Sequence, residues 1–173
     1  MIKTEKIFLR KLSPKRDVSK KYLNWMNDPE IQEFTEQRYK RHSLTNIKNF
    51  ILEKNKSSKD FLFGIFLKKN NNNTHIGNIK IGSINYIHKT AEISYFIGQK
   101  EYWGKGYTTI AIKLIIKIAK KMGLKKLKAG VYQTAIGSKK VLKKNNFKLE
   151  GIFRSEVVYK GKRCNLYWYG KIL

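Results

Sequence analysis

Apolar residues along this chain recur in two patterns, which predict strands and helices in alternation. Short apolar runs predict strands at residues 7–12, 61–67, 75–86, 91–98, 127–132, 147–159 and 163–172. Apolar positions three and four residues apart predict helices at residues 19–26, at 43–55, after residue 106 and at 138–144. The order of these elements predicts an α/β (α+β) fold with one mixed sheet and helices on both of its faces.

Three local signals refine this prediction. Ser43 precedes the second helix and can cap its free N–H groups. The uninterrupted apolar run at residues 61–67 is typical of a strand buried at the centre of a sheet. Residues 68–74 consist of Lys, Asn and Thr and predict a hairpin tip.

The most informative segment lies where the fourth strand ends and the third helix begins. The strand ends at Gly98, and Gly104-Lys105-Gly106 leads into the helix. A strand followed by a glycine turn and a helix start presents free N–H groups and a positive dipole end, which bind phosphate. The first helical turn has Thr108 and Thr109 but no acidic residue, so the negative charge is expected to arrive with a ligand.

Two common phosphate-binding motifs fit this segment poorly. A Walker loop has four residues between its first glycine and Gly-Lys-Ser/Thr, whereas five residues separate Gly98 from Gly104. In addition, Gly106 stands where the metal-binding hydroxyl of a Walker loop belongs. A dinucleotide fingerprint needs a third glycine near Thr109 and a strand that opens the domain.

The segment Glu101-Tyr-Trp-Gly-Lys-Gly106 resembles the acetyl-CoA loop of the GNAT superfamily of N-acetyltransferases, although Glu101 replaces the usual Gln or Arg. The flanks at residues 5–12, 22–30, 129–138 and 143–151 resemble the branch of the ribosomal-protein alanine acetyltransferases (RimJ/RimL-like). Two further departures are Asn146 in place of a glycine and Ala135 in place of an asparagine that commonly contacts pantetheine.

The resemblance implies a mostly antiparallel seven-stranded sheet whose fourth and fifth strands splay apart, with acetyl-CoA bound beside the gap. Main-chain donors at residues 104–108 would bind the diphosphate, and backbone amides near Phe96 and Ile97 would polarise the thioester carbonyl. The expected cofactor-binding residues are Phe96, Ile97, Trp103, Gly104, Lys105, Gly106, Tyr107 and Thr108.

The resemblance also suggests catalytic residues. Ser138 matches a serine that would donate a hydrogen bond to the departing sulfur, although a serine at a helix start can instead cap the helix. Glu92 is the only carboxylate of its strand. If its side chain points into the gap, Glu92 is the first choice as general base. If the side chain points outward, Glu92 is only a charge on an edge strand. Glu36 and Tyr95 are candidates for binding the acceptor. Leu142 occupies the position of a tyrosine that spermidine acetyltransferases use, which argues against a polyamine.

The net charge of +26 comes from 32 Lys and only 6 Arg. Readers of nucleic acid rely on Arg, so a compositional bias toward Lys, Asn and Ile explains this charge as well as a functional attraction does. Acidic residues cluster at Asp28, Glu30, Glu33 and Glu36, where they could attract a cationic amine or simply lie on a solvated surface.

Length and composition bound the remaining possibilities. We expect residues 1–173 to form a single acetyltransferase domain, as a monomer or homodimer. The sequence has no long apolar span and no signal-like N-terminus, and its single cysteine fits a cytoplasmic protein. Its three histidines lack metal-ligand spacing, so no metal is expected.

Together these features predict an enzyme that transfers an acetyl group from acetyl-CoA to a primary amine by direct attack in a ternary complex. The acceptor expected first is a protein N-terminal amine, and the alternative is an amino group on a nucleotide-linked sugar. A different class, a non-catalytic basic module that binds RNA or the ribosome, is less favoured because the lysines concentrate on helices.

Overall fold

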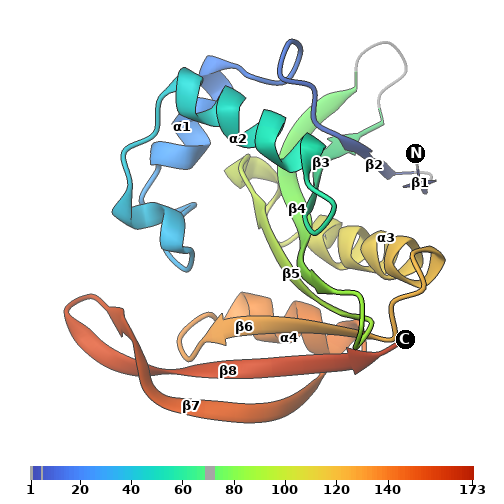
Figure 1. The fold of residues 1–173 in the computed structure, drawn as a ribbon. Coiled ribbons are helices and arrows are strands. Elements are labelled where there is room, and N and C mark those ends of the chain that lie inside the picture. The colour runs from blue at the N-terminus through green and yellow to red at the C-terminus, as the bar shows by residue number, and fades with distance from the viewer. Residues whose placement is uncertain (1, 5, 69–72) are drawn as a thin grey trace.

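The computed structural model describes residues 2–4, 6–68 and 73–173, so the predicted hairpin tip falls largely outside the described residues. The strands form one sheet in the order β1-β2-β3-β4-β5-β6-β8-β7 (Figure 1). Their bounds are Ile2–Lys3 (β1), Ile7–Lys11 (β2), Phe61–Leu67 (β3), Thr74–Asn85 (β4), Thr90–Ile97 (β5), Lys126–Tyr132 (β6), Lys148–Tyr159 (β7) and Lys162–Ile172 (β8). The seven predicted strands are confirmed, and β1 adds a two-residue strand beside β2.

The four predicted helices are present: α1 (Lys20–Asn27), α2 (Leu44–Lys56), α3 (Tyr107–Lys121) and α4 (Ile136–Lys144). Two short 3₁₀ turns, η1 (Glu36–Tyr39) and η2 (Lys100–Tyr102), were not predicted. The predicted cap is confirmed, because the Ser43 hydroxyl accepts a hydrogen bond from the Asn46 N–H at 3.2 Å. Among the described residues, no helix combines the length and apolar character needed to cross a membrane.

Successive side chains of each strand point to opposite faces of the sheet, so the core is divided into two clusters, one on each face. On β2, Phe8 belongs to the cluster under α1 and α2, with Trp25, Ile51 and Phe66. The neighbouring Ile7 and Leu9 belong to the cluster under α3, which includes Ile112 and Ile115. Each fully buried Ile or Leu contributes about 1.5–3 kcal/mol relative to an exposed one, so both layers are firmly attached to the sheet.

The sheet opens between β5 and β6, the fourth and fifth of the predicted strands, as the family resemblance implied. These strands form the parallel pair of the described sheet, and they pair only at Thr90–Lys126, Ala91–Leu127 and Glu92–Lys128. Beyond this point β5 stays with β4, whereas β6 continues along β8 as far as Tyr132. A wedge-shaped gap therefore begins after Glu92 (Figure 1).

One wall of this gap depends on the close approach of β4 to β5 at Gly77. A Cβ atom at Gly77 would lie 2.3 Å from the Phe96 carbonyl oxygen and 2.9 Å from Ile97 Cα. Since backbone atoms cannot yield as a flexible side chain does, Gly77→Ala is expected to lower the free energy of unfolding by about 1–3 kcal/mol.

Urea denaturation followed by circular dichroism measures this change, with Gly151→Ala as the control. No atom lies within 4 Å of a Cβ placed at Gly151, also on a strand, so that variant should stay within about 0.5 kcal/mol of the parent. Equal stability of the two variants would contradict the packing argument.

Candidate functional site

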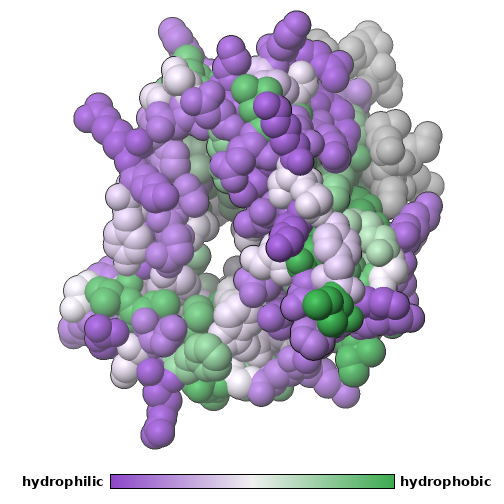
Figure 2. Space-filling view, viewed as in Figure 1, coloured by the Kyte–Doolittle hydropathy of each residue, from purple (hydrophilic) through white to green (hydrophobic). Residues whose placement is uncertain are grey.

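A cavity of about 670 Å³ lies where β5 and β6 diverge. Its walls come from β4 and β5 on one side, from β6 and β8 on the other, and from the segment that includes α1, η1 and α2. Figure 2 shows an opening in the middle of the molecule between these layers. The cavity is lined by aromatic and aliphatic side chains with a few polar groups, which is typical of a ligand site.

The side chains of β5 alternate between the cavity and the α3 side. Glu92, Ser94 and Phe96 share a face with Lys80 and Asn78 of β4, since these residues are paired or adjacent in the register, and all five line the cavity. Ile93 and Ile97 pack in the core cluster under α3, and Tyr95 packs against it. Ile93 and Tyr95 nevertheless line the same cavity, so the cavity is bounded by residues from both faces of β5.

Tyr95 and Ser138, both predicted site residues, meet in the wall of this cavity. The Tyr95 hydroxyl donates a hydrogen bond of 3.5 Å to the Ser138 carbonyl oxygen. Burial raises the pKa of the Tyr95 phenol, an effect only partly offset by its hydrogen bond with Ser138, so the phenol is protonated at neutral pH. Ser138 is not the cap of α4, because Ala135 occupies that position and no side chain bonds there.

The backbone of β5 offers free groups to the gap. The Gly98 N–H donates to the Ile76 carbonyl oxygen at 2.8 Å. Antiparallel strands alternate paired and unpaired backbone groups, so Phe96 is turned toward β4 whereas Tyr95 and Ile97 are turned toward β6. This favours Ile97 over Phe96 as the predicted amide that faces the gap. The Trp103 indole Nε1 donates to the Ile97 carbonyl oxygen at 2.8 Å and so ties the loop to the strand.

The glycine loop and the start of α3 present a row of backbone N–H groups. Gly104 and Gly106 have φ angles of +72° and +81°, which glycine adopts without strain. Within the described residues, none of the backbone N–H groups of residues 104–109 donates a hydrogen bond. The first turn of α3 has no acidic residue, and the N–H groups lie at its positive dipole end.

The acidic cluster predicted to attract an amine is engaged in contacts within the protein. Lys100 of η2 forms ion pairs with Asp28 at 2.9 Å and with Glu30 at 2.5 Å. The hydrogen bond from Lys100 lowers the pKa of the Asp28 carboxyl. These contacts attach the end of α1 to the loop that follows β5. Of the four acids, Glu36 lines this cavity, whereas Asp28, Glu30 and Glu33 are paired with lysines of the protein itself.

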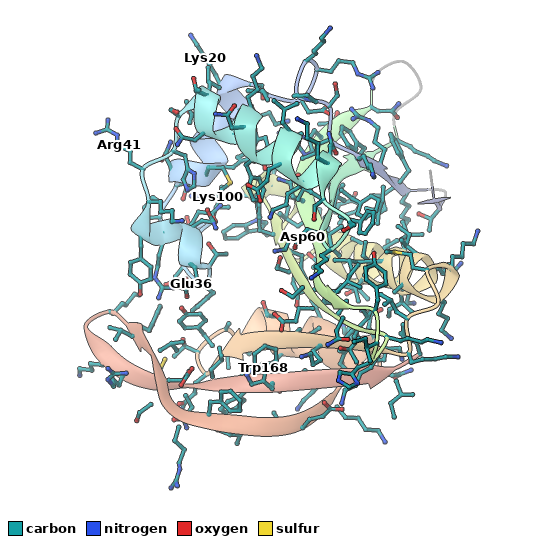
Figure 3. All side chains as sticks on the ribbon, in the orientation of Figure 1. Lys20, Glu36, Arg41, Asp60, Lys100 and Trp168 are labelled. Carbon is teal, nitrogen blue, oxygen red and sulfur yellow. The ribbon has the colours of Figure 1, made fainter. Side chains whose placement is uncertain are left out.

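The other two acids connect the α1–α2 segment to the far side of the gap. The Tyr159 hydroxyl of β7 donates to Glu33 at 2.5 Å, and Lys160 lies 3.3 Å from the same carboxylate. The Tyr132 hydroxyl of β6 donates to Glu36 at 2.5 Å. Figure 3 shows Glu36 at the edge of the opening that these elements surround.

Arg38 and Tyr132 belong to this connection and were missed by the sequence analysis. The Arg38 guanidinium donates to the Tyr132 hydroxyl at 3.0 Å and to the Val158 carbonyl oxygen of β7 at 2.8 Å. Burial and the hydrogen bond to Glu36 raise the pKa of Tyr132 to about 12. No local motif could have revealed a contact between residues 94 positions apart.

Glu92 lies at the closed end of the gap, where β5 and β6 still pair. Its carboxylate lines the cavity, is 41% exposed and lies 3.7 Å from Lys128 Nζ. The side chain thus has the orientation that a general base requires, and its role stays a prediction. Leu142, in the position of the family's tyrosine, is fully buried in the core.

Two buried donors that the sequence analysis also missed lie in the cavity walls. Asn78 Nδ2 on β4 and Trp168 Nε1 on β8 have no hydrogen-bond partner among the described residues. Trp168 is labelled in Figure 3, below the opening. β4 alternates apolar residues with polar ones such as His75 and Lys80, so Asn78 stands at an ordinary polar position and nothing in the sequence marked it as buried.

Comparison with known proteins places these features in a family. Residues 6–148 match the family model described as an acetyltransferase (GNAT) domain. The chain is 33% identical over 111 residues to the probable N-acetyltransferase YjcK of Bacillus subtilis (strain 168), and this match covers 63% of the chain and 60% of YjcK. The chain thus spans less than two thirds of that relative.

Two solved structures share the fold. Spermidine N-acetyltransferase from Vibrio cholerae, in complex with CoA and spermine, has a TM-score of 0.85 at 19% identity, covering 98% of this chain and 96% of that one. The Salmonella typhimurium acetyltransferase that modifies the N-terminal serine of ribosomal protein L7/L12 has a TM-score of 0.82 at 16% identity, with the same coverage of 98% and 96%. Since the family model matches most of its residues, this chain belongs to the GNAT acetyltransferases.

Proposed function

We propose that this protein is an acetyl-CoA-dependent N-acetyltransferase whose acceptor is the α-amine of a protein N-terminus. The observation that carries the proposal is the row of free N–H groups at residues 104–109 beside a strand end that leads into a cavity. The row would bind the diphosphate of acetyl-CoA, with Lys105 adding positive charge. The pantetheine arm would pair with the gap-facing backbone of Tyr95 and Ile97, and Trp103 would lie against it.

The chemistry then requires few groups. The acceptor amine, entering from the cavity, attacks the thioester carbon; a C–N bond forms and the C–S bond breaks. The Ile97 N–H stabilises the charge that develops on the carbonyl oxygen. Glu92 accepts the proton of the amine, directly or through water, and Ser138 donates a hydrogen bond to the departing sulfur. The acceptor would enter the cavity from the α1 and α2 side, and the cofactor from the side of the loop before α3, so that their reactive ends meet at the edge of β5.

The contacts of the acidic residues argue against a polyamine acceptor. Asp28, Glu30 and Glu33 are paired with lysines of the protein itself, which leaves Glu36 and Glu92 in the cavity. A polyamine carries several positive charges, and the protein has a net charge of +26. These two carboxylates are themselves engaged, Glu36 by Tyr132 and Glu92 by Lys128, and a single terminal amine carries only one charge for them to bind.

An amino group on a nucleotide-linked sugar is the second candidate, because Lys40, Lys54 and Lys80 line the cavity and could hold a diphosphate. Lys54 and Lys80 both pair with Asp60, however, at 3.4 Å and 3.7 Å. The charge available for a diphosphate is therefore reduced, and the mostly apolar walls fit a peptide better.

Thiol release from acetyl-CoA, measured against N-terminal peptides, nucleotide-linked amino sugars and polyamines, tests the proposal. Peptides with free α-amines should be acetylated, and the same peptides with blocked N-termini should not. Turnover of amino sugars alone would overturn the proposed acceptor. Failure to bind acetyl-CoA, together with tight and salt-sensitive RNA binding, would overturn the proposed activity.

Gly104→Ala should weaken acetyl-CoA binding about tenfold, because a side chain at a φ of +72° costs about 1–2 kcal/mol and the loop would relax to another conformation. Calorimetry with acetyl-CoA measures the effect. Gly123→Ala is the matched control: Gly123 lies just beyond the other end of α3 with a φ of +76°, and no atom lies within 4 Å of its Cβ position either. An equal loss of affinity in both variants would contradict the loop assignment.

Ser138→Ala should lower kcat about 100-fold with little change in acetyl-CoA affinity, since a donor to the leaving group acts mainly in the transition state. Steady-state kinetics with a peptide acceptor measures both quantities. Ser58→Ala is the control, because Ser58 is exposed and its carbonyl oxygen, which bonds Tyr86, is retained. Unchanged turnover in Ser138→Ala would reject the role.

Glu92→Gln should reduce kcat/KM at neutral pH about 100-fold and remove the rise in rate that accompanies ionisation of the base. The pH–rate profile of the variant tests this, with the exposed Glu156→Gln as the control. A profile that matches the parent in shape and height would exclude Glu92.

A further inference from the structure

Asn78 carries one of the two buried donors in the cavity wall that lack a hydrogen-bond partner among the described residues. It is only 3% exposed, it lines the cavity, and its Nδ2 has no hydrogen-bond partner among the described residues. The Tyr22 phenol lies beside the amide, and its interaction with Asn78 partly offsets the rise in the Tyr22 pKa that burial causes, but Nδ2 forms no hydrogen bond with it among the described contacts. A buried amide without a partner costs free energy, so this donor is expected to serve a ligand.

The orientation of the Asn78 amide follows from its neighbour His75. His75 Nε2 lies 3.0 Å from the Gly77 carbonyl oxygen and 2.8 Å from Asn78 Oδ1. A carbonyl oxygen can only accept, so Nε2 carries the proton and Asn78 must present its oxygen to it. The Nδ2 group is therefore directed away from His75 and stays free.

His75 keeps this arrangement at physiological pH. Burial lowers its pKa to about 4, so the ring is neutral above that value. Aromatic rings surround it: Phe66 is stacked at 4.7 Å between centroids, and Trp25 and Tyr22 contact it edge-on at 5.0 Å and 5.7 Å. The charged groups nearest to the ring are Asp17 and Lys21, which affect its pKa in opposite directions. The amide is thus held in one orientation by a rigid support.

The position of Asn78 is close to the reaction proposed above. Asn78 is the register partner of Phe96 on β5, and paired residues of antiparallel strands lie about 5 Å apart. Phe96 directly precedes Ile97, whose amide would face the thioester. A group bonded to Asn78 would therefore lie on the cavity face that Asn78 shares with Phe96, one strand from the Ile97 amide. In a peptide, the first carbonyl oxygen is three bonds from the α-amine nitrogen, so it is the acceptor group best placed to reach this face.

We propose that Asn78 Nδ2 donates a hydrogen bond to the first carbonyl oxygen of the acceptor and so selects amines that have a carbonyl on the adjacent carbon. The inference rests on the proposed function and deepens it. The donor aligns the α-amine with the thioester and discriminates against simple alkyl amines. Asn78 is a residue for positioning and specificity, and the proton transfer is left to other groups.

Two small acceptors of nearly equal shape test the inference: alaninamide and sec-butylamine, which lacks the carbonyl. Asn78→Ala and Asn78→Asp both remove the donor, and the second keeps the volume of the side chain. Each variant should lower kcat/KM for alaninamide 10- to 100-fold, mostly through KM, which is the loss expected for one hydrogen bond. The kcat/KM for sec-butylamine should change less than about threefold. Calorimetry with acetyl-CoA confirms that each variant is folded.

Asn145→Ala is the matched control. Asn145 is another buried asparagine, 4% exposed, with an unpartnered Oδ1, but it lies at the end of α4 and does not line the cavity. Its loss should lower stability without changing the ratio between the two acceptors. Equal losses for both acceptors in the Asn78 variants would overturn the inference and leave the proposed function intact. Acetylation of an amino sugar but of neither peptide nor alaninamide by the parent would overturn the proposed acceptor and this inference with it.

Discussion

The early end of the pairing between β5 and β6 is the constraint on which the rest of the structure depends. After Glu92 and Lys128 the two strands have different neighbours, because β5 is held by β4 and β6 is held by β8. A strand edge inside a sheet normally exposes unpaired backbone groups, which is unfavourable unless a ligand or another strand uses them. Here the exposed edge includes Ile97, directly before the loop that leads to α3.

The gap between β5 and β6 stays open because side chains outside these two strands join the elements on its two sides. Lys100 attaches the loop after β5 to the end of α1, while Glu33, Glu36 and Arg38 attach the α1–α2 segment to β6 and β7. Individual surface ion pairs contribute little, but a network that joins two layers restricts their relative movement. The acids that look like a substrate patch in the sequence therefore act chiefly as structural links.

The sequence predicted what depends on local pattern and could not predict what depends on distant contacts. Strand bounds, the Ser43 cap and the loop at residues 104–106 follow from apolar spacing and glycine chemistry, and the structure confirms them. The bonds of Tyr132 with Glu36 and of Tyr159 with Glu33 join residues about a hundred positions apart. The separation of β5 and β6 was expected only from the resemblance to a family, because no periodicity in a single sequence reveals it.

Asn78 illustrates why a buried polar residue carries more information than a charged surface. The chain has 38 basic residues, and compositional bias explains their number as well as function does. A buried amide has no such explanation, because each unsatisfied donor costs free energy that the fold must offset elsewhere. His75 fixes the amide through a single bond, and the aromatic residues around His75 fix the ring in turn. Selection for stability alone would have favoured an apolar residue at this position.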